Sequence, residues 1–191
     1  MSFKKLDELG SIQWPCNESA PLGTPIMHVD EFVRGKGQFM ITDYLPTTEV
    51  ANRKFPLLLT TGRNLVQYNV GTQTRRTHNN LWANEDVLEI HPADASARGI
   101  DSNSLVLLRS RKGETTLKAI VTEKIQAGVV YTTFHNPETG ANVVTTENSD
   151  WATNCPEYKV TAVEIEPANH RSKWQEKRKT DRNQLEQIIN T

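Results

Sequence analysis

The sequence predicts a mainly β fold, a small mixed barrel with short helices, which follows an irregular N-terminal arm and precedes a C-terminal helix. Short runs rich in Val, Ile, Leu and Thr recur between residues 54 and 167, separated by turn residues. The helical patterns among them are too few and too short to alternate with the strands as βαβ units. After Pro167 the composition becomes almost wholly polar. We therefore expect three parts, an arm over 1–53, a barrel domain over 54–167 and a charged helix or tail over 168–191.

The arm is predicted to lack a core of its own. Proline and glycine interrupt every short apolar stretch in it, as at Trp14-Pro15 and Gly35-Lys36-Gly37. One apolar run, residues 38–41, predicts a strand. The rest of the arm is predicted to wrap around other parts of the structure.

The barrel domain opens with its best strand, the apolar run 55–61, which Gly62 closes. Further strands are expected at 104–109, 115–122, 128–133 and 159–165. The tetrad Arg111-Lys112-Gly113-Glu114 predicts a hairpin turn between the first two of these.

Three helices are expected. One follows Gly62 to about residue 69, and one starts at Pro92 and ends at Gly99, because proline suits the first turn and glycine the C-terminal cap. In the tail, Ser172 and Gln175 have capping-box spacing before the apolar stripe of Leu185, Ile188 and Ile189. We interpret this tail as a solvated helix on its own domain, with a docking helix for a partner subunit as the alternative.

Composition excludes several classes of function. With 22 Lys+Arg against 23 Asp+Glu, the chain lacks the positive excess that nucleic-acid binding requires. No apolar run approaches the roughly 20 residues of a membrane span, and the charged N-terminus does not resemble a secretion signal. Cys16 and Cys155 are too few and too far apart for a disulfide framework or a zinc site. We expect free thiols and a cytoplasmic protein, with neither nucleic acid nor membrane as a partner.

Two polar clusters are candidates for chemistry, although no motif of self-sufficient catalysis is present. The first, residues 60–77, follows the best strand with Thr, Gly and Arg, whose N–H groups, hydroxyls and guanidinium suit a phosphate. The second, residues 134–146, offers His135, Asn142 and Thr145 as donors and acceptors for a heteroaromatic ligand. Ordinary turns are the alternative for both. The five histidines show no close pairing, so we expect no metal site.

The chain resembles the C-terminal domain of molybdenum-dependent formate dehydrogenase alpha subunits, most of all the soluble NAD-linked type. The resemblance extends over about residues 6–165 and rests on ordered segments at 10–16, 23–25, 58–63, 67–77, 88–95, 128–135, 141–146 and 154–160. It implies a six-stranded double-psi β-barrel of the aspartate-decarboxylase type, which forms one wall of the site for molybdopterin guanine dinucleotide.

The resemblance also implies the residues that meet the cofactor. Those expected near its phosphates and pterin are Thr61, Gly62, Arg63, Gln67, Tyr68, Asn69, Thr72, Thr74 and Arg75. His135, Asn142 and Thr145 are expected against a pterin, and Tyr158 and Lys159 against a dinucleotide. Arg and Lys neutralise a pyrophosphate, while Asn and Gln match the mixed donors and acceptors of a pterin edge. One departure is Ser102-Asn103-Ser104 in place of Asp-Gly-Asp, a turn that should survive because Asn tolerates the left-handed conformation.

The function implied is cofactor binding in an enzyme that oxidises formate to CO2 and passes electrons through iron–sulfur clusters to NAD. The metal, molybdenum or tungsten, would be ligated by upstream domains, so we expect no catalytic or metal-ligating residue here. The chain alone should be inactive and hold no cofactor tightly. Implied partners are the upstream catalytic and iron–sulfur domains and NAD-reducing, diaphorase-type subunits. The alternatives are another molybdoenzyme such as nitrate reductase, or a non-enzymatic barrel module that binds a protein.

Overall fold

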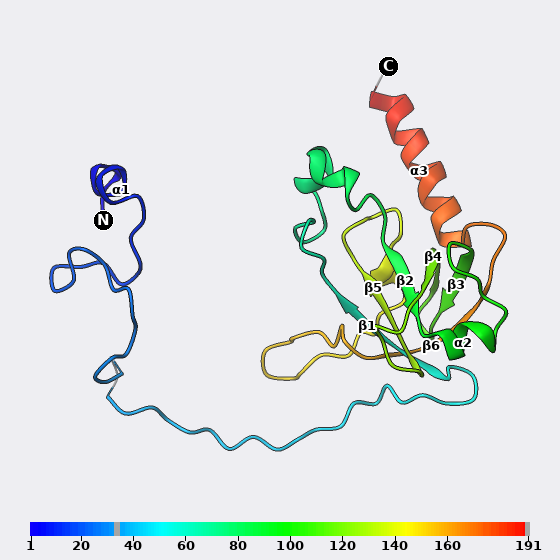
Figure 1. The fold of residues 1–191 in the computed structure, drawn as a ribbon, viewed down its shortest axis with the longest axis horizontal. Helices are drawn as coiled ribbons and strands as arrows, with labels where there is room; N and C mark the ends of the chain where they lie inside the picture. Colours follow the sequence, from blue (N-terminus) through cyan, green and yellow to red (C-terminus); the bar gives the residue numbers. More distant parts are fainter. Residues whose placement is uncertain (33–34, 190–191) are drawn as a thin grey trace. The chain divides into compact units, whose positions relative to one another are not determined.

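The computed structural model describes residues 1–32 and 35–189, which form two units, Met1–Leu45 and Pro46–Thr191 (Figure 1). In the first unit, helix α1 (Phe3–Leu9) begins at Ser2, whose hydroxyl accepts a hydrogen bond from the N–H of Lys5. The strand predicted at 38–41 is wrong, because these residues form no strand and the side chain of Phe39 is 99% exposed. An apolar run does not make a strand where no sheet offers it hydrogen-bond partners.

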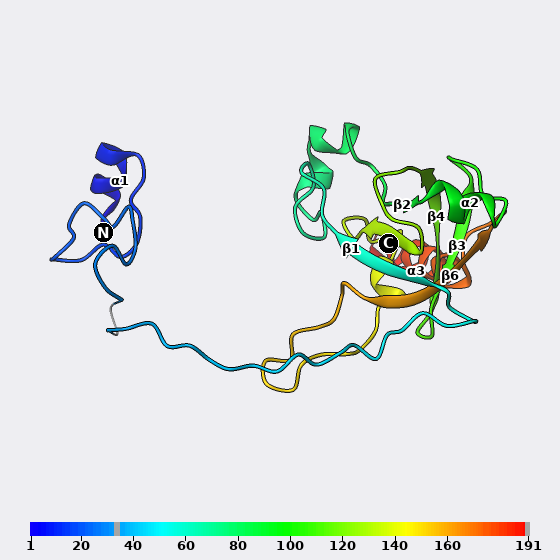
Figure 2. The same ribbon diagram turned by 60° about the horizontal axis from the view of Figure 1, so that its bottom comes forward.

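The second unit is a closed barrel of six strands, which confirms the predicted mainly β barrel (Figure 2). In sequence order the strands are β1 (Leu57–Gly62), β2 (Val87–Ile90), β3 (Leu105–Arg109), β4 (Glu114–Val121), β5 (Val129–Thr133) and β6 (Thr161–Pro167). Around the barrel they follow the order β1-β5-β2-β4-β3-β6.

Two of the six pairings are parallel, and they decide where loops meet. β1 runs parallel to β5, with Gly62 opposite Thr133, and β2 runs parallel to β4. The pairs β1–β6, β2–β5, β3–β4 and β3–β6 are antiparallel. Because parallel strands end at the same edge, the two polar clusters that follow β1 and β5 leave the barrel side by side.

The barrel core consists of alternate side chains from every strand, as the period of two in a strand requires. Its fully buried members include Leu59, Leu88, Val106, Val130 and Val163. Each side chain of this size contributes about 1.5–3 kcal/mol on burial, so the barrel is a rigid support for its loops.

Several local predictions are confirmed. Helix α2 (Pro92–Ser96) starts at the predicted proline, and the hairpin turn between β3 and β4 closes with a hydrogen bond from the N–H of Ser110 to the carbonyl of Gly113. Asn103 has φ 71°, the left-handed conformation that was expected of it.

One local prediction in the barrel unit is wrong, and one strand was missed. The helix expected from Gly62 to about residue 69 is absent; irregular turns lead instead to two short 3₁₀ helices, Thr74–Arg76 and His78–Leu81. Strand β2 was not predicted, because it has only four residues and Glu89 interrupts its apolar run. It forms because β4 and β5 pair with it on both sides.

The terminal helix and its capping box are confirmed as α3 (Lys173–Ile189). The N–H of Gln175 donates to the hydroxyl of Ser172 at 3.3 Å, and the amide oxygen of Gln175 accepts from the N–H of Ser172 at 3.1 Å. That amide also exchanges two 3.0 Å hydrogen bonds with the backbone of Thr116, which fixes α3 to β4.

At the other end of the unit, Glu49 ties the segment that precedes β1 to the barrel. Its buried carboxylate accepts the N–H of Ala162 at 2.7 Å and pairs with Arg111. Among the described residues, no helix is long and apolar enough to cross a membrane.

Candidate functional site

The segments after β1 and β5 are joined by the ring of His135, which is 2% exposed. Its Nε2 accepts a hydrogen bond from the N–H of Asn64 at 3.0 Å, and its Nδ1 faces the carbonyl oxygen of Asn69. Because Nε2 accepts, the proton lies on Nδ1, where it is donated to that carbonyl. Both ring nitrogens thus hold the polar segments together, and any ligand contact of His135 is left to the ring carbons.

The buried carboxylate of Asp86 stabilises the segment after β5 through hydrogen bonds. Its carboxylate accepts hydrogen bonds from the N–H groups of His135 at 3.1 Å and Asn136 at 2.8 Å, and from the hydroxyl of Thr133. Sequence reasoning missed Asp86. The available signal was an acid directly before an apolar run, which is weak because acids commonly flank strands in surface turns.

The segment after β1 is braced by its own side chains rather than by a helix. The side-chain oxygen of Asn64 accepts the N–H groups of Val66 and Gln67, forming an Asx-type turn. Gln67, itself buried, donates to the carbonyl of Ala83 at 2.8 Å and accepts the hydroxyl of Thr74 at 2.5 Å. Gln67 and Thr74, both predicted site residues, therefore shape the loop.

Residues from before β6 reach the same edge. The hydroxyl of Thr61, at the end of β1, donates to the carbonyl of Tyr158 at 2.8 Å, and the ammonium group of Lys159 donates to the carbonyl of Thr61. This places the predicted residues Tyr158 and Lys159 beside the predicted turn Thr61-Gly62-Arg63.

Gly62 in that turn lies directly against Tyr131, and a Cβ at Gly62 would overlap with the phenol. The hydroxyl of Tyr131 donates to the carbonyl of Arg63 at 3.3 Å. Burial, and then the charges of Glu89 and Asp86, raise the pKa of Tyr131, so it remains a donor at neutral pH.

Positive charge gathers at this edge without acidic partners. Within residues 1–32 and 35–189, none of the ion pairs includes Arg63, Arg75, Arg76 or Lys159. By contrast, Arg98, Arg109 and Arg111 elsewhere on the barrel all pair with glutamates. Unpaired guanidinium and ammonium groups that converge on one edge favour an anion there.

Arg75 is the most distinctive of these cations. Its Nε is buried and has no hydrogen-bond partner among the described residues. The side chain packs on Gly71, where a Cβ would come within 2.8 Å of Arg75 Cγ and of the carbonyl oxygen of His135. A buried donor without an acceptor is costly, and an anionic oxygen would satisfy it.

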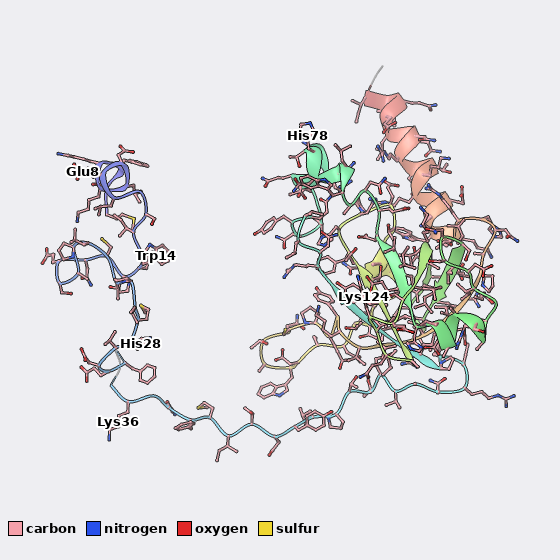
Figure 3. All side chains as sticks on the ribbon, in the orientation of Figure 1. Glu8, Trp14, His28, Lys36, His78 and Lys124 are labelled. Carbon is pink, nitrogen blue, oxygen red and sulfur yellow. The ribbon has the colours of Figure 1, made fainter. Side chains whose placement is uncertain are left out.

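The remaining predicted residues differ in exposure. Tyr68, Asn69 and Thr72 are exposed, as is His78 further along the chain (Figure 3). Asn142 is exposed on the 3₁₀ helix Ala141–Val143, and buried Thr145 donates to its carbonyl at 3.0 Å. The described residues contain no cluster of His, Cys, Asp or Glu that could hold a metal, and Cys16 and Cys155 are free thiols.

Comparison with known proteins identifies the family of the barrel domain. Residues 57–162 match the model of the Molydopterin dinucleotide binding domain. The chain is 40% identical over 169 residues to the F420-dependent formate dehydrogenase subunit alpha of Methanocaldococcus jannaschii, covering 87% of this chain and 25% of that protein. It is 32% identical to formate dehydrogenase H of Escherichia coli, covering 87% and 24%. It is 31% identical to the assimilatory nitrate reductase catalytic subunit of Bacillus subtilis, again covering 87% and 24%.

A solved structure shares the fold. Acetylene hydratase from Pelobacter acetylenicus superposes with a TM-score of 0.52 at 15% identity, over 60% of this chain and 18% of that one. The chain spans about a quarter of the length of the curated relatives that it matches. From the match over residues 57–162 and the identity to these oxidoreductases, we conclude that the chain belongs to the family of molybdopterin dinucleotide-binding domains.

Proposed function

We propose that this chain binds molybdopterin guanine dinucleotide as the C-terminal portion of a formate dehydrogenase alpha subunit. The observation that carries the proposal is the set of cations near the β1–β5 edge that form no ion pair among the described residues, above all Arg75, whose buried Nε has no hydrogen-bond partner there. A pyrophosphate group supplies the negative oxygens that these cations lack.

The residues present fit such a group. Arg63, Arg75 and Lys159 would bind its phosphates, and the exposed amides of Asn69 and Asn142 would face the donors and acceptors of its pterin. Gln67, Thr74 and His135 would act as positioning residues, since their polar atoms are already used within the loops. When bound, the cofactor supplies the two-electron chemistry at its metal, molybdenum or tungsten; this chain binds and orients it.

For the whole protein, we propose oxidation of formate to CO2, a proton and two electrons, which leave through iron–sulfur clusters of upstream domains. The proposed acceptor is NAD, through diaphorase-type subunits, and F420 is the second candidate because three relatives are named as F420-dependent. The chain alone would be inactive and would hold the cofactor weakly. Nitrate reduction is a second candidate function, favoured by the 31% identity to the Bacillus subtilis enzyme.

Purification of the native polypeptide that carries this sequence tests the proposal. We expect acid hydrolysis to release GMP in a stoichiometric amount, and formate, not nitrate, to be turned over with NAD or F420 as acceptor. In the same polypeptide Arg75→Ala should lower the GMP content, while Arg109→Ala, on the paired side of the barrel, should leave it unchanged. Purified protein without pterin or GMP would refute the proposal, and nitrate turnover would favour the second candidate.

A further inference from the structure

Residues 38–45, at the end of the first unit, form an apolar segment without a partner in the part of the chain that the structure describes. They run without helix, strand or turn (Figure 1), and every one of them is exposed. Phe39 and Ile41 are 99% and 97% exposed, and Tyr44 is 86% exposed. Asp43 is the only charged residue among the eight. Such a stretch is typical of an interaction site, since left uncovered it would promote aggregation.

The composition of the segment is that of a β-strand. Phe, Ile, Thr and Tyr are enriched in strands, and eight residues lie within the usual strand length of roughly 3–10. Both ends are defined, because Gly35 and Gly37 precede the segment and Pro46, which lacks the N–H group that a ladder needs, follows it. Among the described residues, its backbone forms no hydrogen bond. The segment therefore retains the donors and acceptors of an unpaired strand.

The sheet of this chain offers no place for such a strand. The six barrel strands close on themselves in the order β1-β5-β2-β4-β3-β6, and a closed barrel has no free edge. Outside the barrel, the described residues contain isolated bridges but no strand. An edge that pairs with residues 38–45 must therefore belong to a part of the protein, or to a partner, beyond the described residues.

The segment starts from a fixed point on the barrel unit. Three residues after Pro46, the buried carboxylate of Glu49 accepts the N–H of Ala162 at 2.7 Å and pairs with Arg111. From Pro46, eight extended residues span at most about 26–29 Å. A sheet edge of the same polypeptide within that reach would meet the segment at a high effective concentration, an advantage that an edge on a separate molecule does not have.

We propose that residues 38–45 pair as an added strand with a sheet edge in the upstream part of the same polypeptide; the inference rests on the proposed function, which makes this chain one portion of a longer subunit. The match covers 25% and 24% of two curated relatives, so about three quarters of their length lie outside it, enough to contain a sheet. Backbone hydrogen bonds give such pairing its affinity, and Phe39 and Ile41, which share a face in a strand, would fill apolar pockets beside the edge.

Hydrogen exchange in the full native polypeptide tests the pairing. We expect the amides of residues 38–45 to exchange at least about a hundredfold more slowly than in an unstructured peptide, with every second amide protected, because alternate N–H groups of an added strand face its partner. Ile41→Asp should lower this protection at least about tenfold, since it places a charge in an apolar pocket. Ile26→Asp is the matched control and should leave the protection unchanged, because Ile26 is 70% exposed in the same unit but lies outside the segment.

A photoreactive phenylalanine analogue in place of Phe39 identifies the partner. We expect a cross-link to the upstream part of the same polypeptide, and a mixture of unlabelled and heavy-isotope-labelled protein distinguishes a link within one copy from a link between copies. A cross-link to a second copy, to another subunit or to residues 46–191 would overturn the proposal. Amides of residues 38–45 that exchange at the rate of an unstructured peptide would also overturn it.

The outcomes separate this inference from the function on which it rests. If residues 38–45 are unprotected in a polypeptide that releases GMP stoichiometrically, the strand pairing is refuted and the proposed function stands. If they are protected and cross-link upstream in a polypeptide without pterin or GMP, the strand pairing is supported and the cofactor assignment is refuted.

Discussion

The N–H group of Asn64 and the Nε2 atom of His135 form a 3.0 Å hydrogen bond between residues 71 positions apart. With the contact from Nδ1 to the carbonyl of Asn69, this ring joins the two segments that we assign to the cofactor. Neither segment has a helix or strand to stabilise it over residues 63–73 or 134–140. Their geometry therefore depends on a few buried polar contacts, which makes it testable by single substitutions.

Replacement of His135 by Phe should lower the free energy of unfolding by about 1–3 kcal/mol, because the N–H of Asn64 and the carbonyl of Asn69 would lose their partner in a buried setting. Urea denaturation measures this difference. His78→Phe is the control, because the side chain of His78 is exposed. This substitution should leave the free energy of unfolding nearly unchanged. Equal stability of the two variants would show that the ring does not join the segments.

Asp86→Asn should be similarly destabilising, by about 1–3 kcal/mol, because an amide NH2 would face donors that now reach a carboxylate. The neighbouring Glu85→Gln is a matched control: it removes only an exposed ion pair with Lys118, worth about 0–1 kcal/mol. Amide hydrogen exchange at His135 and Asn136 should accelerate in the Asp86 variant. Unchanged exchange at both positions would contradict the role given to Asp86.

A comparison of Gly140→Ala with Gly99→Ala separates the stability lost through an unfavourable backbone conformation from the stability lost through steric overlap. The two glycines have almost the same φ, +62° and +63°, but a Cβ at Gly99 meets nothing within 4 Å while one at Gly140 overlaps with Trp174. Gly99→Ala should cost about 1 kcal/mol. Gly140→Ala should cost about 1–3 kcal/mol more, measured by urea denaturation, because the indole must move. Equal losses of stability in the two variants would mean that Trp174 and α3 move to accommodate the added Cβ without an energetic cost.

The pKa of Asp150 is lowered from an ordinary 3.8 to about 2, first by the hydroxyl of Thr153, then by the N–H groups of Thr153 and Cys155. A depressed pKa means that the carboxylate stabilises its turn fully above pH 3.8 and that this contribution is lost as pH falls towards 2. An NMR titration of the Asp150 carboxyl carbon measures the midpoint. Thr153→Val should raise it towards 3.8, whereas Thr180→Val, on α3, should not. An unchanged midpoint in Thr153→Val would contradict the hydroxyl's role.

Five of the six barrel strands could be predicted because their apolar runs are bounded by turn residues, as Gly62 bounds β1. β2 could not, since its four residues become a strand only through pairing with β4 and β5. The false helix after Gly62 has a related cause. Asn64 accepts the N–H groups of Val66 and Gln67 through its side chain, which competes with helical hydrogen bonding.

The candidate site likewise contains some residues whose role the sequence predicts and others whose role it does not. Arg63, Arg75 and Lys159 could be selected from residue chemistry and family resemblance, and none of them forms an ion pair within the described ranges 1–32 and 35–189. The role of His135 in joining the two segments could not be predicted, because it depends on a contact between residues 71 positions apart in the sequence. Asp86 was missed for a similar reason: nothing in its local sequence shows which loop the barrel brings beside it.

The pairing of β1 also has a consequence for synthesis of the protein. Among the described strands, β1 pairs with β5 and β6, which begin about 70 and 100 positions later in the chain. On the ribosome, Leu57–Gly62 must therefore wait for the segment up to Thr133 before it can pair with β5, and for the segment up to Pro167 before it can pair with β6. At about 5–20 residues per second each delay lasts several seconds or more. Until then the edge that we assign to the cofactor is incomplete, so we expect the cofactor to bind there only after the segment up to Pro167 has been synthesised.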